Sequence, residues 1–314
     1  MAEIEPFSLP GRFWRGNLHT HSQLSDGALT LERAVEAYRE AGYDFVQMSE
    51  HFIARYNWPI ADTRPFRSNR FTTILGAELH AMATSVGELW HIVAAGLPLD
   101  FPPAGKDETG AELAARAAAA GAFVGIAHPA WSQLTIEDGR SIESAHAVEI
   151  YNHGCFVEVD RGDGWYLLDQ LLREGRRLTA FATDDAHFRS DDAFGGWVHV
   201  KAEALEPEAL VAALKAGHYY SSQGPQIHEL AFDGDELAVA CSPVNSIAVM
   251  GHNSRTAGRF GRAITQARIK LSDLAKSWTE LPPSPWIRVA LIDAAGRRAW
   301  TNPIWRDERE GRRQ

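Results

Sequence analysis

Two histidines separated by one residue, His19 and His21, lie in the stretch GNLHTHSQLSDG near the start of the chain. Side chains at positions i and i+2 of a strand point to the same face, so this pair would present two imidazole nitrogens to one point. Such a pair suits a metal ion, because imidazole is a common metal ligand. Taken alone the pattern is a weak signal, since an HxH pair also occurs by chance.

Further histidines and carboxylates lie where other predicted strands begin or end. The chain has 13 histidines, and about half of them fall at such positions. The segments concerned are Glu50-His51, Glu78 with His80, His91, His128-Pro129 and Asp184-Asp185-Ala186-His187. If the strands are parallel, their ends meet at one edge, where so many polar groups need a cation to satisfy them. Imidazole and carboxylate without thiolate favour zinc, manganese or iron(II) over a structural Cys₄ zinc site.

The elements that position these residues alternate between strand-like and helix-like segments from Trp14 to about Gly224. Strands are expected at 15–21, 44–51, 71–80, 91–97, 122–129, 147–152, 178–187 and, less clearly, 195–202. Helices are expected at 30–42, 107–121, 164–175 and 207–217, from apolar residues at helical spacing and glycines at their ends. This alternation predicts an α/β fold with a mainly parallel sheet, and seven or so such units could close into a barrel.

The sequence pattern changes after Gly224, from alternating strand-like and helix-like segments to short strand-like runs. Short alternating runs broken by Asp-Gly, Pro-Pro and Ala-Gly predict a small antiparallel β domain over about 225–306, followed by the charged tail RDEREGRRQ. Cys155 and Cys241 are interpreted as buried free thiols.

Composition excludes some classes of function. Of the 314 residues 45% are apolar, which is enough for a sizeable core, and the net charge of −10 argues against a general binder of nucleic acids or membrane surfaces. The N-terminus lacks a basic region followed by an apolar run, and no apolar stretch approaches the roughly 20 residues that cross a bilayer. We therefore expect a soluble cytoplasmic protein that forms no stable nucleic-acid complex; an oligomer is possible.

The ordered motifs HTHSQLSDG, SEH, GAE, a later histidine before IVAAG, AHP and DDAH resemble those of the PHP (polymerase and histidinol phosphatase) superfamily of metal-dependent phosphoesterases. The stretches WRGNLHTHSQLSDG, EIYNH, FATDDAHF, GGWV and AWTNPIW are similar to its carbaryl-hydrolase-like (CehA/McbA-like) branch. The resemblance implies a distorted seven-stranded β/α barrel of the PHP type in residues 1–224, carrying two to three divalent ions. Residues 225–314 would form a small β-sandwich-like domain with a charged tail.

Carried over residue by residue, the resemblance also implies the metal ligands. They are His19, His21 and Asp185 for the first metal, Glu78 as the bridge to the second, His91 and His128 for the second, and Asp26, His51 and His187 for the third. Glu50 stands where the family commonly has aspartate, a position that orients a ligand. Its longer side chain leaves the occupancy of the third site open. Asp184 stands where serine is common. It is a proton shuttle, an acceptor for a histidine N–H, or a polar residue at a strand end.

Candidate substrate contacts are fewer. The loop RYNWPIADTRPFRSNRF carries Arg55 and Arg67, which are either solvated arginines or part of a cationic substrate loop. Arg189 follows His187 closely and is expected near the metals, as a substrate contact or catalytic group. His153, after the strand AVEIYN, is a candidate substrate contact or general acid.

These features favour a metal-dependent hydrolase (EC 3.1). Two metals that share a water lower its pKa from about 15.7 toward 7, so a bridging hydroxide could attack a small phosphomonoester or phosphodiester. The alternatives are a carboxylic ester or carbamate hydrolase with the same centre, and a non-catalytic metal-binding protein. The expected partner is a small, phosphorylated substrate.

Overall fold

The computed structural model describes residues 2–275 and 284–305. The chain divides into two compact units, Gly11–His218 and a second unit that combines Met1–Pro10 with Tyr219–Gln314. The first ten residues thus group with the C-terminal segment, whereas the sequence places them in the N-terminal domain. The reason is a strand pairing: β1 (Ala2–Glu3) pairs antiparallel with β13 (Ile227–Asp233).

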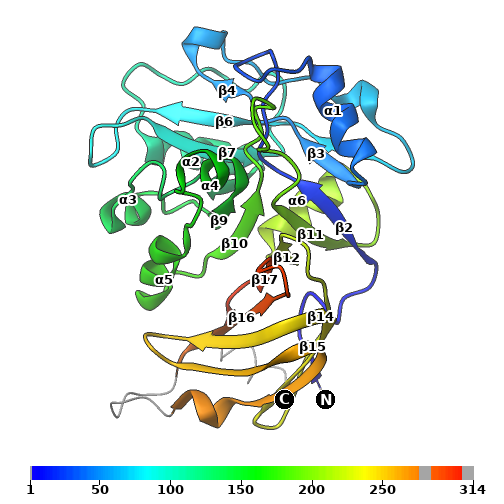
Figure 1. The fold of residues 1–314 in the computed structure, drawn as a ribbon. Helices are drawn as coiled ribbons and strands as arrows, with labels where there is room; N and C mark the ends of the chain where they lie inside the picture. Colours follow the sequence, from blue (N-terminus) through cyan, green and yellow to red (C-terminus); the bar gives the residue numbers. More distant parts are fainter. Residues whose placement is uncertain (1, 276–283, 306–314) are drawn as a thin grey trace. The chain divides into compact units, whose positions relative to one another are not determined.

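The unit Gly11–His218 contains two hydrogen-bonded rows of strands (Figure 1). One row is β11-β2-β3-β5 and the other is β10-β9-β8-β7-β6-β4. Their bounds are β2 (Arg12–Asn17), β3 (Phe45–Gln47), β4 (His51–Phe52), β5 (Thr72–Ile74), β6 (Gly76–Ala81), β7 (Trp90–Ala95), β8 (Phe123–Ile126), β9 (Ala147–Asn152), β10 (Thr179–Thr183) and β11 (Trp197–Ala202).

The closed seven-stranded barrel expected from the sequence is not found among the described residues. The expected strands at 44–51 and 71–80 are each interrupted, so that β3 and β5 pair in one row while β4 and β6 pair in the other. Five pairings in this unit are parallel, but β7 runs antiparallel to both its neighbours, because residues 82–89 join it to β6 without a helix. The result is a mixed α/β fold with a largely parallel pairing.

Four of the six helices of this unit, the first four along the chain, begin at a residue whose side chain caps them. Their bounds are α1 (Leu31–Glu40), α2 (Gly110–Ala119), α3 (Ile136–Ser141), α4 (His153–Val159), α5 (Trp165–Arg173) and α6 (Pro207–Lys215), with short 3₁₀ turns at Ala54–Tyr56 and Arg64–Phe66. The Thr30 side chain accepts a hydrogen bond from the Arg33 amide, and Thr109 forms a capping box with Glu112. Because Asn152 caps Cys155, the segment after β9 turns directly into α4, a helix that the sequence did not predict.

The second unit is an antiparallel sheet. It contains β12 (Tyr219–Ser222), β13, β14 (Glu236–Gly251), β15 (Thr256–Lys270), β16 (Trp286–Ile292), β17 (Arg298–Thr301) and β18 (Ile304–Trp305), with a 3₁₀ turn at Leu271–Ala275. The expected charged tail at 306–314 lies outside the described residues. In the described part of the chain, no helix is both long and apolar enough to cross a membrane.

Candidate metal centre

The HxH pair follows β2 and lies against the segment that follows β10. His21 N donates to Ala186 O at 2.9 Å, and Asp185 N donates to His19 O at 2.8 Å. Both imidazoles are fully buried, and their Nε2 atoms lie 3.2 Å (His19) and 3.0 Å (His21) from Asp185 Oδ1. Two segments more than 160 residues apart in the chain thus bring two histidines and a carboxylate together.

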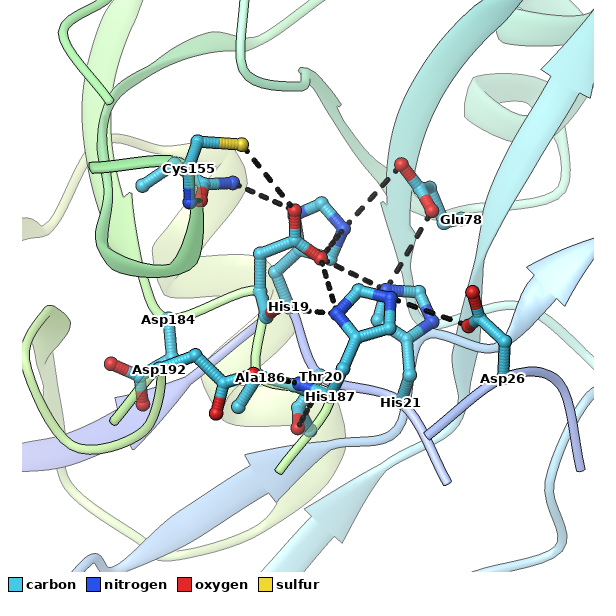
Figure 2. Close-up of polar contacts among 12 residues, drawn as sticks. His19, Thr20, His21, Asp26, Glu78, Cys155, Asp184, Ala186, His187 and Asp192 are labelled. Atoms are coloured by element: carbon cyan, nitrogen blue, oxygen red, sulfur yellow. Dashed lines mark hydrogen bonds and ion pairs between the residues drawn. The ribbon is translucent and has the colours of Figure 1, made fainter. Parts of the chain in front are cut away.

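Glu78, in β6, is the centre of the group. Its carboxylate is buried, and Figure 2 shows it facing His19 and His21. The shortest distances are Oε1 to His91 Nδ1 at 2.7 Å, Oε1 to His128 Nε2 at 3.1 Å, Oε1 to His19 Nε2 at 3.5 Å and Oε2 to His51 Nδ1 at 2.6 Å. One carboxylate therefore has both oxygens within reach of separate sets of imidazoles, the arrangement that a bridging ligand requires.

A further group forms around Asp26, on the loop after the HxH pair. Asp26 Oδ1 is 3.3 Å from His51 Nε2 and 3.3 Å from His187 Nε2. The ring of His21 stacks against both His51 and His187, with centroid distances of 4.3 and 4.4 Å. Figure 2 shows Asp26, His21 and His187 on one side of the group and Glu78 on the other.

Four sets of side chains in this region could each hold a metal ion. The sets are His19, His21 and Asp185; His19, Glu78 and His128; His21, Asp26, His51 and His187; and His51, Glu78, His80 and His91. All nine ligands expected from the sequence belong to one or more of these sets, and His80 is added to them. The assignment of ligands to individual ions stays a prediction.

Hydrogen bonds behind the rings indicate which nitrogen faces the centre. His19 Nδ1 lies 3.1 Å from Glu149 Oε1, and His187 Nδ1 lies 2.9 Å from Asp185 O. Both partners are acceptors, so each Nδ1 carries the proton and leaves Nε2 with a free lone pair. This is the orientation in which a metal-binding histidine is usually held.

His80 was noticed in the sequence but not assigned a role. Its Nδ1 faces the carbonyl oxygen of Trp90 at 3.1 Å, so Nδ1 donates and Nε2 accepts. His80 Nε2 in turn lies 2.9 Å from His51 Nδ1. His51 Nδ1 therefore donates, with Glu78 Oε2 at 2.6 Å as a second acceptor, and Nε2, 3.3 Å from Asp26 Oδ1, is the nitrogen that an ion would bind in place of a proton.

Glu149, in β9, is a functional candidate that sequence reasoning missed. It is fully buried and accepts hydrogen bonds from His19 Nδ1, His128 N (2.6 Å), Asn152 Nδ2 (3.0 Å) and Thr183 Oγ1. The available signal was a charged residue inside the otherwise apolar run AVEIYN, which is unusual unless that charge has partners.

Glu50 binds neighbouring hydroxyl and amide groups rather than the centre. Its carboxylate accepts from Ser22 N at 3.0 Å, Ser22 Oγ at 2.5 Å and Ser25 Oγ at 2.5 Å. These bonds fix the loop that carries Asp26, which matches the orienting role expected of this position.

Carboxylates hold part of the centre positively charged. Burial lowers the pKa of His51, but the charges of Glu78 and Asp26 outweigh this effect and raise the pKa to about 10. Burial likewise lowers the pKa of His187, and the hydrogen bond to Asp26 contributes to raising it to about 9. Burial and the charges of His51 and His187 lower the pKa of His21 to about 3. A cation bound among the carboxylates would replace these protons.

Three buried polar atoms of the group lack a hydrogen-bond partner in the described part of the chain, which bears on whether a metal ion fits here. Among the described residues, His19 Nε2, Glu78 Oε2 and Asp26 Oδ1 are buried without a hydrogen bond of acceptable geometry. Leaving such atoms unsatisfied costs about 1–3 kcal/mol each. All three belong to residues of the four metal-binding sets and can act as ligand atoms. The donor set and its orphaned atoms therefore fit one or more divalent cations.

The predicted catalytic and substrate residues lie elsewhere or make other contacts. The His153 ring contacts the Tyr151 hydroxyl at 2.9 Å, and Arg67 Nε donates to Thr73 O at 3.1 Å. Arg55 lies 5.4 Å from the ring centroid of Tyr56. Arg189 donates to the backbone oxygen of Asp26, so it supports the ligand loop. None of these contacts joins His153 or an arginine to a side chain of the four metal-binding sets.

Asp184 is buried and hydrogen-bonded away from the histidines. Its carboxylate accepts from Tyr38 Oη at 2.8 Å, Gly195 N at 2.8 Å and Gly196 N at 2.9 Å. Burial raises its pKa to about 6 despite these bonds. Of the three roles considered from the sequence, this geometry matches a polar residue that fixes the strand end.

A cavity of about 850 Å³ adjoins the centre at His91. Its lining includes Trp131, Gln133, Val159 and Arg161. The centroid of the Trp131 ring lies 5.4 Å from that of the His91 ring and 5.1 Å from that of the His128 ring. The cavity therefore gives a small molecule access to His91, one of the expected ligands.

Comparison with known proteins supports the fold. No family model matches the sequence, and comparison with curated proteins finds no relative. Among solved structures, the chain is similar to a two-domain protein from Bacteroides vulgatus that contains a predicted PHP-like metal-dependent phosphoesterase. The two sequences are 13% identical and the TM-score is 0.50. The match covers 93% of this chain and 95% of that one. A second similar structure is an amidohydrolase from Chromobacterium violaceum, solved with bound sulfate and no metal. The sequences are 13% identical, the TM-score is 0.44, and the match covers 56% of this chain and 89% of that one.

At this level of identity the first similarity concerns the fold alone. Neither description names the carbaryl-hydrolase-like branch, which stays an expectation from sequence motifs. The chain therefore shares its fold with the two-domain protein from Bacteroides vulgatus, and its buried histidine–carboxylate group can hold metal ions.

Proposed function

We propose that the protein is a metal-dependent hydrolase of the PHP type that cleaves small phosphate esters. The observation that carries the proposal is Glu78, a buried carboxylate with histidines at 2.6, 2.7 and 3.1 Å and one oxygen left without a hydrogen bond. A core carboxylate in such surroundings is costly unless it binds a cation. The ordered motifs and the fold support the same assignment.

Two to three divalent ions, zinc, manganese or iron(II), suit this mixture of imidazole and carboxylate. When bound, such ions supply a nucleophile at neutral pH and offset negative charge on a phosphoryl group. Glu78 would be shared between ions, while Asp26 and Asp185 would serve opposite sides of the group. Glu149 and His80 would orient ligand histidines through the hydrogen bonds behind their rings.

The cavity beside His91 is the proposed substrate site. Arg161 lines it, and this guanidinium supplies a positive charge that the predicted arginines do not bring to the centre. Trp131 adds a flat wall beside two ligand histidines. A small phosphorylated molecule would place its phosphate at the ions and its remaining part in this cavity.

The test combines elemental analysis with a substrate panel. Protein purified without added metal would be analysed for bound ions, and then assayed with p-nitrophenyl phosphate, bis-p-nitrophenyl phosphate, p-nitrophenyl acetate and an aryl carbamate. We expect at least two metal equivalents and turnover of a phosphate substrate. Turnover of only the carbonyl substrates would show that the reaction is wrong. Equal, negligible turnover by wild type and His128→Ala on every substrate would show that the protein is a non-catalytic metal binder.

A further inference from the structure

A second cavity lies in the same unit, at the strand ends opposite those that carry the ligands. It has a volume of about 650 Å³ and is lined by residues of α6 and by Leu75, Gly96 and Gly121. Along β7 the chain runs from His91 at the metal centre to Gly96 at this cavity, and along β8 it runs from Gly121 here to His128 there. The cavity is therefore separated from the metal centre by the length of these strands.

The walls of this cavity are mainly apolar. Ile74, Leu75, Leu97, Val211 and Ala212 contribute to its lining. Gly96 has φ +97°, and a Cβ atom there would meet both Val211 methyl groups at 3.1 Å. Glycine therefore lets the chain after β7 approach α6 closely, in a conformation that other residues rarely adopt.

Two cations, Arg67 and Lys215, belong to this lining, and their hydrogen-bond acceptors are neutral. Arg67 Nε donates to Thr73 O at 3.1 Å and Thr73 Oγ1 at 3.3 Å, and Lys215 Nζ donates to Gly121 O at 3.1 Å. All these acceptors are neutral, and no ion pair of either side chain within 4 Å is found among residues 2–275 and 284–305. The lining also includes Glu208 in the first turn of α6, where the helix dipole stabilises a carboxylate.

We propose that this cavity binds an amphipathic monoanion, a medium-length aliphatic carboxylate. The volume falls within the range of small-molecule sites, which are mostly apolar with a few polar groups that fix orientation. The aliphatic chain would pack against the walls from β5, α6 and the segment after β7. The carboxylate would pair with Arg67 and Lys215, whose charges exceed that of Glu208 by one. This site is independent of the proposed hydrolysis.

Octanoate is a suitable probe, and calorimetry on the full chain measures its binding. Because a carboxylate could also bind to metals, the titration uses the Glu78→Gln variant as well as the wild type. We expect octanoate to bind both proteins with equal affinity, and octanol and butyrate to bind at least tenfold more weakly. Binding that disappears in Glu78→Gln would overturn the proposal, because the probe would then have occupied the metal centre.

Variants locate the site. Arg67→Gln and Lys215→Gln should each weaken octanoate binding at least fivefold, whereas Arg70→Gln, an exposed arginine of the same loop outside the lining, should leave it unchanged. Ala212→Trp should abolish binding by filling the cavity. Ala212 is exposed on α6, so this variant should keep the fold, which thermal unfolding checks. Wild-type affinity in Ala212→Trp, or in both charge variants, would show that the cavity is not the site.

Discussion

Asp184 and Asp185 are consecutive in the chain, yet they belong to two different kinds of buried polar region. The Asp184 carboxylate accepts hydrogen bonds from one hydroxyl and two backbone amides. The backbone amide of Asp184 donates to Asn17 Oδ1 at 2.9 Å. The Asp185 carboxylate lies instead among histidines, with Oδ1 at 3.0 Å from His21 Nε2. The strand β10 ends at Thr183, and Asp185 has a φ of 56° in the left-handed region, so the chain turns here and the two consecutive carboxylates enter different regions.

The difference between these regions lies in hydrogen-bond satisfaction. Around Asp184, Tyr38 and Asn17 give and receive bonds with good geometry. Around Asp185 and Glu78, buried atoms of the proposed ligands lack such bonds. Buried polar groups are nearly always paired in native proteins, so the exceptions indicate a missing partner. The first region is therefore structural, while the second is built to receive a cation.

The largest expected effect comes from Glu78→Gln. The substitution keeps the shape of the side chain but removes the negative charge shared by the surrounding histidines, so at least one metal equivalent should be lost. Hydrolysis should fall by more than 100-fold, beyond the 10–100-fold typical of residues that only orient ligands. Elemental analysis and the substrate assay measure both.

The matched control for this change is Glu112→Gln, at an exposed glutamate in the first turn of α2. It should keep full metal content and activity. If Glu78→Gln retains the metal content of the wild type, the carboxylate has been placed wrongly as the bridge.

The next largest effect is expected from His80→Phe. Without His80, only Glu78 Oε2 at 2.6 Å remains as an acceptor for His51 Nδ1–H. The His51 ring is then held less firmly with Nε2 toward Asp26, and metal affinity should fall about 10–100-fold. Competition with a metal chelator measures the affinity. His80→Gln, which keeps an acceptor at this position, should recover most of it; equal losses in the two variants would argue against the orienting role.

Tyr38→Phe tests the structural region. It removes the hydroxyl that donates to Asp184 and leaves buried partners unpaired, at a cost of about 1–3 kcal/mol in the free energy of unfolding. Urea denaturation measures the loss. Metal content should stay at the wild-type value, and a loss of metal together with stability would mean that the two regions are one functional site.

The smallest effect concerns His199, a buried histidine outside both regions. Burial and the positive charge of Arg15 lower its pKa to about 3, whereas His51, which lies beside Glu78 and Asp26, has a raised pKa. The unfolded chain binds a proton at His199 below about pH 6.5 and the folded protein does not, so stability falls as the pH drops toward 3. At pH 5 the loss is about 2 kcal/mol.

His199→Gln should remove this share of the pH dependence. Glutamine is neutral and can still accept from Trp197 Nε1, which lies 2.9 Å from His199 Nε2. Denaturation at pH 7 and pH 5 would compare the two proteins. An identical drop in stability for wild type and variant would show that His199 is protonated in the folded state as well.

Much of the local structure followed from sequence pattern. The helices expected at 30–42, 107–121, 164–175 and 207–217 correspond to α1, α2, α5 and α6, because their apolar spacing and caps act within a few residues. The strand expected at 147–152 corresponds to β9. The helix α4 that follows it was not expected; Asn152 caps this helix, and His153 at its start contacts the Tyr151 hydroxyl. Glu149 was missed because it lies in an apolar run whose partners are distant in the chain.

The sequence by itself determined which residue types stand at the strand ends, and in which order, and these were enough to predict nine residues that the fold brings together. Only the tertiary structure decided which nitrogen of each ring faces which carboxylate, that Arg67 lies at the second cavity, and that the strands form two rows. The physical reason is range. Helix caps and side-chain alternation depend on neighbours along the chain, whereas the ring orientations depend on contacts between residues 29 to 164 positions apart.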